Sequence, residues 1–186
     1  ELELPFERED WGSGFRPTDT PEFLALNPNA MVPVLVDGDE VLWESNTICR
    51  YLSARYGAGR LLPVDALDRA RVEQWMDWQA TELNNAWRYA FMALVRDSPV
   101  HRDAIQVAAS ITQWNRHMGI LEQQLERTGA FVTGPEFSLA DIVLGLSVNR
   151  WLMTPIEHPV LPAIDDYVAR LRERPAYLEY AGNGVP

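Results

Sequence analysis

Residues on either side of a predicted β-hairpin have the types needed to hold a small extended peptide. Val32 and Pro33 precede the hairpin, and Glu44 and Ser45 follow it. Only an X-Pro bond adopts the cis form at low cost. A cis Val32-Pro33 bond would turn the amide and carbonyl of Val32 outward, where a peptide could pair with them as an added strand. The pattern therefore predicts backbone recognition of a ligand just before the hairpin.

Glu44 and Ser45 suit the head group of an α-amino acid, because a helical pattern begins there. At a helix N-terminus, free backbone N–H groups and the helix dipole attract a carboxylate, and the Ser45 hydroxyl adds a donor. Glu44 can receive an ammonium group. An ordinary hairpin with a Ser cap is the alternative interpretation, which Glu-Ser alone favours. The Val-Pro pair at this distance favours the ligand site.

Short strands and helices within residues 1–57 must position these groups. Pro33 opens a run of β-forming residues, and Asp37-Gly38 is typical of a two-residue hairpin loop. Gly57 ends the helix that follows Glu44. The elements expected here are a strand at 4–8, a helix at 20–26, the hairpin with its return strand at 41–43, and a helix ending at 56.

After a linker at 58–64, residues 65–186 are predicted to form a second, all-helical domain. The segment 65–98 contains neither Gly nor Pro and has apolar residues at helical spacing, which predicts one long amphipathic helix. Ser138 and Asp141 have the spacing of a capping box, in which each side chain bonds the backbone N–H of the other. The further helices are expected over 107–125, near 138–153 and over 160–174.

The Val-Pro before a hairpin, the Glu-Ser at the next helix and the later capping box together resemble the glutathione transferase family. The resemblance covers nearly the whole chain and implies a thioredoxin-like α/β domain followed by an all-α domain. It also implies a homodimer in which Val32, Pro33, Glu44 and Ser45 bind glutathione as co-substrate. The implied reaction joins the glutathione thiolate to a small electrophilic substrate.

The sequence departs from the family pattern in two features, a missing first strand and the residue before Val-Pro. The resemblance implies a first strand in the middle of the N-terminal sheet, and no such strand precedes the segment 4–8, so we expect a segment upstream of Glu1. The family's thiol-activating Ser, Tyr or Cys follows that strand, so the catalytic residue is also expected upstream. Met31 occupies the often cationic position before Val-Pro, which removes one possible contact to the glycine carboxylate.

Aromatic residues of the long predicted helix are candidates for the electrophile pocket, although core or interface packing would also explain them. Two alternative functions stay open. One is a non-catalytic binding or regulatory protein on the same scaffold, and the other is a glutathione-dependent isomerase, dehalogenase or ether-cleaving enzyme. The pocket candidates are Trp78, Trp87, Tyr89 and Phe91.

The composition excludes several other classes. A formal net charge of −11 argues against nucleic acid and anionic membranes as partners, and no apolar run approaches a membrane-spanning length. The single Cys49 excludes an internal disulfide, fits a cytoplasmic location, and is interpreted as a small buried hydrophobe. His101, His117 and His158 are too far apart for a local metal signature, so no metal is expected.

Overall fold

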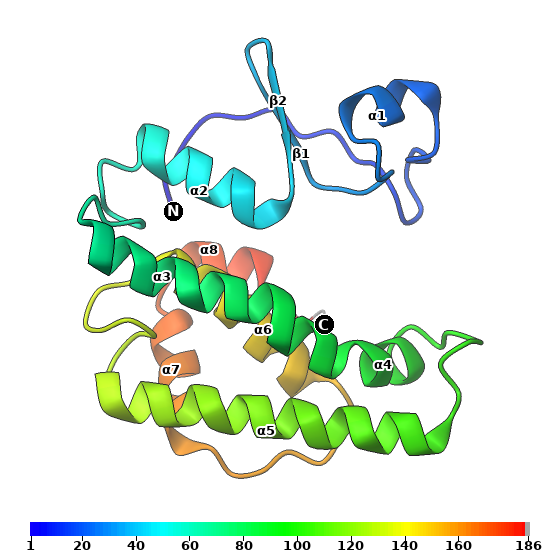
Figure 1. Cartoon of the computed structure of the whole chain (residues 1–186), viewed down its shortest axis with the longest axis vertical. Coiled ribbons are helices and arrows are strands. Elements are labelled where there is room, and N and C mark those ends of the chain that lie inside the picture. The colour runs from blue at the N-terminus through cyan, green and yellow to red at the C-terminus, as the bar shows by residue number, and fades with distance from the viewer. Residues whose placement is uncertain (185–186) are drawn as a thin grey trace. The chain divides into compact units, whose positions relative to one another are not determined.

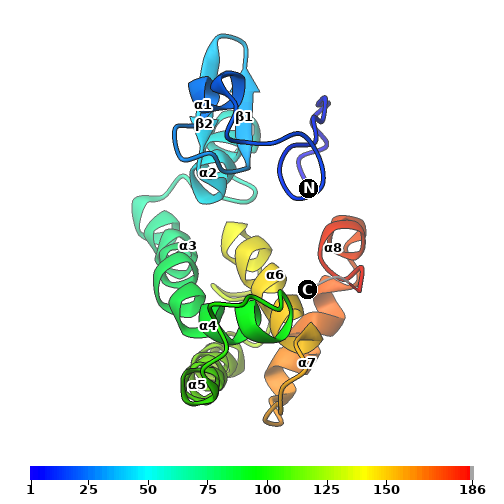
Figure 2. The ribbon, with the colours of Figure 1, turned by 90° about the vertical axis from the view of Figure 1, so that its right-hand side faces the viewer.

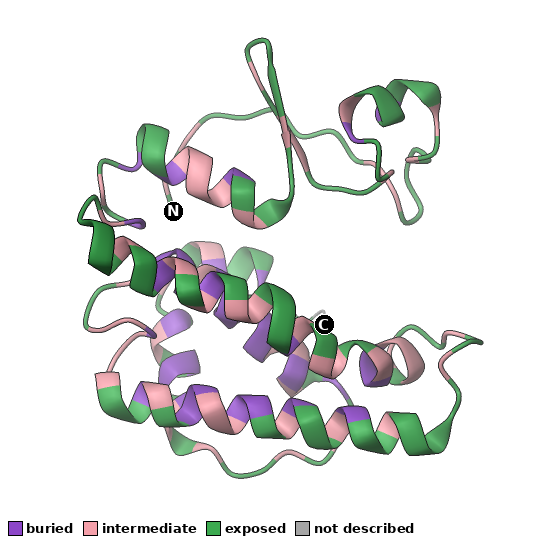
Figure 3. Cartoon of the chain, viewed as in Figure 1, coloured by how far each residue is buried: buried purple, intermediate pink, exposed green. Residues whose placement is uncertain are grey.

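The chain folds into two compact units in the computed structural model, which describes residues 1–184. The first unit is Glu1–Leu62, and the second begins at Pro63. Figure 1 follows both along the chain, and Figure 3 shows that exposed residues dominate the first unit while buried residues concentrate on the helices of the second.

The first unit contains one hairpin and two helices. Its sheet is the antiparallel pair β1 and β2, with Val34 opposite Trp43. The two-residue loop is Gly38-Asp39, one residue later than the sequence suggested, and Gly38 has φ 65° at its first position, which Gly adopts without a Cβ clash. The elements are α1 (Pro21–Leu26), β1 (Val34–Asp37), β2 (Glu40–Trp43) and α2 (Ser45–Tyr56).

The strand predicted at residues 4–8 is wrong. Those residues have no regular structure, and most of them are exposed. The described residues contain no strand beside this segment, so its backbone groups have no ladder to join. Alternating apolar residues favour a strand, but the neighbouring strand decides whether it forms.

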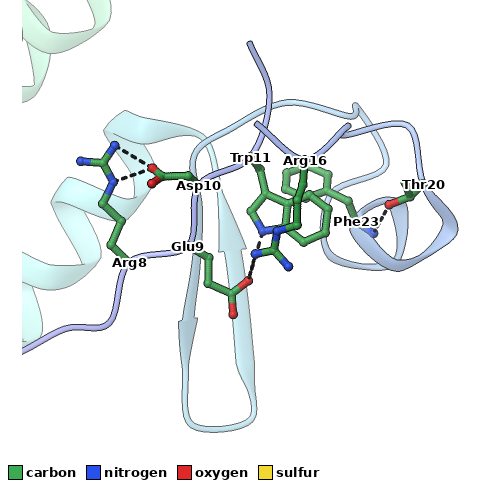
Figure 4. Close-up of polar contacts among 7 residues, drawn as sticks. All are labelled: Arg8, Glu9, Asp10, Trp11, Arg16, Thr20 and Phe23. Carbon is green, nitrogen blue, oxygen red and sulfur yellow. Dashed lines mark hydrogen bonds and ion pairs between the residues drawn. The ribbon is translucent and has the colours of Figure 1, made fainter. Parts of the chain in front are cut away.

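A cluster around Trp11 holds the N-terminal segment instead (Figure 4). The Arg16 guanidinium lies 3.9 Å from the centre of the Trp11 ring, and the Glu9 carboxylate accepts hydrogen bonds from both residues at 2.6 and 3.1 Å. The other neighbour of the Trp11 ring is the buried ring of Phe23, at 5.0 Å between centroids. The Glu9 hydrogen bonds and the Arg16 stacking thus order this segment within itself, and the contact between the Trp11 and Phe23 rings attaches it to α1.

Helices are the only regular elements among the described residues of the second unit (Figure 2). The single helix expected over 65–98 is interrupted by a π-helical turn, because Gln79–Leu83 close wider hydrogen-bonded rings. Pro175 begins a short helix beyond the segment 160–174 predicted as the last helix, since Pro fits the first turn. The elements are α3 (Ala66–Trp78), η1 (Gln79–Leu83), α4 (Asn84–Leu94), α5 (Ala104–Thr128), α6 (Leu139–Met153), α7 (Pro162–Leu171) and α8 (Pro175–Tyr180).

The core of the second unit lies around α6, which contacts α3, η1 and α7. Most residues of α6 are buried, as expected for a helix that is apolar on nearly all sides. Buried apolar residues of α5 and α7 complete the core, and buried positions on both helices are purple in Figure 3. Its largest fully buried members include Trp114, Met118, Leu121, Leu144, Ile164, Tyr167 and Leu171.

The predicted capping box at the start of α6 is confirmed. Asp141 Oδ2 accepts hydrogen bonds from the backbone N–H and the hydroxyl of Ser138, at 2.8 and 2.9 Å. Its Oδ1 accepts from the Val132 N–H at 2.9 Å and the Tyr167 hydroxyl at 3.1 Å. Burial raises the pKa of Asp141, although these donors oppose the rise. The box therefore also joins α7 and the loop before α6.

Candidate functional site

The start of α2 presents polar groups without partners. Glu44 precedes the helix with φ 72°, a backbone conformation that is uncommon for residues other than Gly, and its side chain makes no capping hydrogen bond. Both Glu44 and Ser45 are exposed, and neither side chain is paired with another described residue. The Ile48 N–H bonds the Glu44 carbonyl, whereas the Ser45 N–H lies ahead of this first helical turn. This end of the helix is open to an anionic ligand.

The Val32-Pro33 peptide bond is cis, the form that the predicted recognition of a ligand by the Val32 backbone requires. Val32 is 49% exposed, and β1, which begins at Val34, pairs only with β2 among the described residues. Val32 is thus a half-exposed residue two positions before β1, the place where a ligand in extended conformation is expected to pair.

Asn27 holds the loop that leads to Val32. It is 3% exposed, its Nδ2 donates to the Met31 carbonyl at 2.7 Å, and its Oδ1 accepts the Asn29 N–H at 3.0 Å. An Asn side chain that bonds nearby backbone groups is typical of such turns. Asn27 is not among the predicted site residues, although the Asn27-Pro28-Asn29 run is a turn signal that could have identified it.

Asp37 connects the hairpin to α2. Its carboxylate accepts hydrogen bonds from the Tyr51 hydroxyl at 2.7 Å and the Tyr56 hydroxyl at 2.9 Å, and Arg55 lies 3.7 Å away. The hydrogen bond from Tyr51, followed by that from Tyr56, lowers the pKa of Asp37. These contacts fix the hairpin against the helix, so the residues on both sides of the hairpin are positioned by one small scaffold.

The aromatic residues proposed for an electrophile pocket divide among separate contacts in the second unit. Trp87 and Phe91 meet edge to face at 5.2 Å. Trp78 instead packs against Trp75 at 5.1 Å and His117 at 5.7 Å, and Tyr89 packs against His101 at 4.9 Å. Of these candidates, the structure places only Trp87 and Phe91 in ring contact with each other.

Arg150 of α6 joins this aromatic pair and is not among the residues predicted from the sequence. Its guanidinium lies 4.6 Å from the centre of the Trp87 ring and 5.3 Å from that of Phe91. A second guanidinium, that of Arg96, lies 5.4 Å from the Phe91 ring. Burial, followed by the positive charge of Arg96, lowers the pKa of Arg150. No spacing rule relates Arg150 to residues of α4, so local sequence carried no signal for it.

Other candidate groups are engaged in packing. Cys49 is half-buried, and burial raises the pKa of its thiol, as for an unreactive core cysteine. His117 bonds the Gln113 carbonyl at 2.7 Å, and His158 bonds the Trp151 carbonyl at 2.7 Å. Within residues 1–184, His, Cys, Asp and Glu side chains form no group of three or more that could hold a metal ion. No helix of that described part has the length and apolar character to cross a membrane.

Both units match known protein families. Residues 1–55 match the model described as "Glutathione S-transferase, N-terminal domain", and residues 83–175 match "Glutathione S-transferase, C-terminal domain". The glutathione S-transferase GstB of Escherichia coli strain K12 is 38% identical over 178 residues, which cover 95% of this chain and 85% of that protein. Human glutathione S-transferase theta-1 is 33% identical over 74% of this chain and 56% of its own length.

The structural comparison agrees. The theta class glutathione S-transferase of the citrus canker pathogen Xanthomonas axonopodis pv. citri, solved with glutathione bound, aligns with a TM-score of 0.89 at 37% identity. The alignment covers 97% of this chain and 86% of that one. The fold class predicted from the sequence, an α/β unit followed by an all-helical one, is confirmed.

Proposed function

The chain belongs to the glutathione S-transferase family, and we propose that Val32, Pro33, Glu44 and Ser45 form its glutathione site. The activity is that of a transferase, in which the glutathione thiolate attacks an electrophilic substrate. A carbon–sulfur bond forms. In a substitution, a leaving group departs with the electron pair of the broken bond. In an addition, an activated double bond accepts the electron pair of the thiolate.

The start of α2 carries the proposal. Ser45 and the N–H groups of the first turn bind the carboxylate of the γ-glutamyl residue, because the helix dipole favours negative charge there. Glu44 pairs with the ammonium group of the same residue. Its unusual φ of 72° supports this role, since backbone strain in residues other than Gly concentrates at ligand sites.

Val32 binds the central part of the peptide through its backbone. Val32 is half exposed and lies two positions before β1, so glutathione pairs with its amide and carbonyl like a short additional strand. Recognition by backbone groups does not require a cationic side chain before the Val32-Pro33 pair. It is therefore compatible with Met31 at that position.

The electrophile binds against aromatic surface of the second unit. The half-buried Trp87 supports this, and the buried ring of Phe91 packs against it edge to face. Trp78 and Tyr89 belong to the predicted pocket as well, but their ring contacts with His117 and His101 provide a packing explanation. Replacing Trp87 or Phe91 by Leu should therefore raise the KM for an aromatic electrophile more than the same change at Tyr89.

We further propose a cytoplasmic homodimer. The exposed apolar residues of the chain give a second copy surface to cover, and two-fold symmetric dimers are the commonest soluble oligomers. Light scattering on a sizing column should give about twice the 21.2 kDa mass of the chain. A monomer at high protein concentration would contradict the dimer.

Removal of the ligand's ammonium group tests the role of Glu44. Calorimetric titration compares glutathione with glutaryl-cysteinyl-glycine, which lacks only that group, on the wild type and on Glu44→Gln. We expect the wild type to bind glutathione roughly tenfold more tightly than the analogue, and the variant to show little preference. Glu40→Gln removes an equally exposed carboxylate from the hairpin and should keep the wild-type preference. An unchanged preference in Glu44→Gln would reject the assignment.

Chemical activity is tested separately by conjugating glutathione with an aryl halide. If glutathione binds at Glu44 and Ser45 but its thiol titrates as in free solution and no electrophile is consumed, the chain is a non-catalytic member of its family. A conjugation rate that rises with pH along the same curve as the thiolate absorbance of bound glutathione supports the transferase.

A further inference from the structure

We propose that Asp37 is a positioning residue for glutathione binding, because it fixes the angle between the hairpin and α2. Asp37 acts through the groups at Val32, Glu44 and Ser45, so this role rests on the glutathione site proposed above. All the side chains involved belong to the hairpin and α2 of the first unit.

The proposed glutathione site has two parts, which belong to different elements. Val34, the first residue of β1, pairs with Trp43, the last residue of β2. Val32 and Ser45 therefore both lie beyond the same end of the hairpin. Since β2 ends at Trp43 and α2 begins at Ser45, Glu44 is the whole connection between them (Figure 1). A residue at the end of an element can absorb a change of backbone angles, so this connection alone does not set the direction of α2.

Asp37 connects the opposite end of the hairpin to α2. It is the last residue of β1, and its carboxylate accepts the hydroxyls of Tyr51 at 2.7 Å and Tyr56 at 2.9 Å. Tyr51 lies six residues beyond Ser45, or about 9 Å along the helix axis. Hydrogen bonds at this distance from Glu44 close a triangle of strand, helix and contact. They prevent α2 from turning about Glu44.

The contacts of Asp37 are charge-assisted and supported by a neighbouring cation. The hydrogen bond from Tyr51 lowers the pKa of Asp37 and raises the pKa of Tyr51, so at neutral pH a charged acceptor faces a neutral donor. Arg55 Nε donates to the Tyr56 hydroxyl at 2.8 Å and lies 3.7 Å from the Asp37 carboxylate. Ile48 is the one apolar residue of α2 that is buried, so these polar contacts add to limited packing.

Glutathione requires both parts of the site in one relative orientation. Its γ-glutamyl carboxylate binds the N–H groups of the first turn of α2, while its central part pairs with Val32. Without the tyrosine hydrogen bonds of Asp37, α2 turns about Glu44, and those N–H groups point away from a ligand that is paired with Val32. The apparent affinity then falls with the fraction of molecules that keep the correct orientation.

Calorimetric titration with glutathione compares the wild type, Asp37→Ala and Asp39→Ala. We expect Asp37→Ala to weaken binding roughly tenfold, because it removes the acceptor of both tyrosine hydroxyls. Asp39 is an exposed carboxylate two residues away in the same hairpin, and Asp39→Ala should bind within about twofold of the wild type. Wild-type affinity in Asp37→Ala, or an equal loss in the two variants, would overturn the role of Asp37.

A double-mutant cycle with Ser45→Ala distinguishes positioning from a general loss of stability. The described residues include no common partner of Asp37 and Ser45, and residues without shared partners usually have additive effects. Because Asp37 directs the start of α2, Asp37→Ala should weaken binding less than about threefold when the Ser45 hydroxyl is already absent. The same tenfold loss in both backgrounds would show independent effects and overturn the positioning role.

Tyr51→Phe replaces Asp37→Ala if that variant unfolds, as judged by circular dichroism. It removes one hydroxyl that Asp37 accepts and keeps the ring, so we expect glutathione binding to weaken about threefold. An affinity equal to that of the wild type would overturn the role of Asp37.

The glutathione site and the role of Asp37 fail in different ways. A loss of affinity in Ser45→Ala but not in Asp37→Ala rejects only the role of Asp37. Equal affinities of the wild type and Ser45→Ala, or no binding by the wild type, reject both.

Discussion

The Glu122 carboxylate of α5 accepts the backbone N–H of Ile164 at 2.8 Å, across a sequence separation of 42 residues. Its other oxygen accepts the Ala163 N–H at 2.9 Å. Leu161, the residue that precedes α7, provides no side-chain cap. A buried acid on one helix therefore satisfies the first free N–H groups of another and fixes where α7 begins.

Glu122→Ala should lower the free energy of unfolding by roughly 2–4 kcal/mol, because it leaves two N–H groups at the start of α7 without acceptors. Urea denaturation followed by circular dichroism measures the change. Glu126→Ala, an exposed glutamate one turn further along α5, should change stability by less than about 0.5 kcal/mol. Similar losses in the two variants would refute the capping role of Glu122.

A pair of glycines tests the packing of α6. A Cβ added at Gly145 would lie 2.9 Å from Leu171 Cδ1 and 3.3 Å from Tyr177 Cε2, whereas a Cβ at Gly119 meets nothing within 4 Å. We expect Gly145→Ala to destabilise the protein by about 1–3 kcal/mol through overpacking. Gly119→Ala on α5 should stabilise it by up to about 1 kcal/mol through helix propensity. Chemical denaturation of both variants measures the change in the free energy of unfolding. Equal changes in the two variants would contradict the packing seen around α6.

Cys49 should react slowly with iodoacetamide in the native protein. Burial raises the pKa of its thiol, so the thiolate fraction at neutral pH is smaller than for a free cysteine. The labelling rate should still increase at pH values where the rate for a free cysteine has levelled off, and unfolding in urea should restore the free rate. A native rate equal to that of free cysteine at neutral pH would contradict the structural role.

Short-range patterns predicted the elements next to the proposed site. The hairpin signal at Asp37-Gly38 located the turn to within one residue, and Ser138 with Asp141 located the start of α6, because both depend on contacts a few residues apart. The strand at 4–8 failed for the opposite reason. Its apolar alternation is local, but a strand exists only where a neighbour accepts its hydrogen bonds.

The tertiary features were beyond reach of the sequence. In the sequence, Glu122 does not differ from the other glutamates of predicted helices. Its capping role appears only in the contact between α5 and the start of α7. Arg150 likewise acquires a role only when α6 brings it over Trp87 of α4. Such contacts join residues tens of positions apart, and propensity or periodicity within a window cannot relate them. The sequence did not predict the π-helical turn at Gln79–Leu83 either, since its composition is that of an ordinary helix.

Calorimetric titration of Ser45→Ala with glutathione decides whether the start of α2 binds this ligand. Removing a hydroxyl that donates to a charged carboxylate should weaken glutathione binding roughly ten- to hundredfold. Thr47→Val, which removes an exposed hydroxyl from the same helix, should bind like the wild type. Equal affinities of the wild type and Ser45→Ala, or no heat of binding with either, would contradict a glutathione site at Glu44 and Ser45.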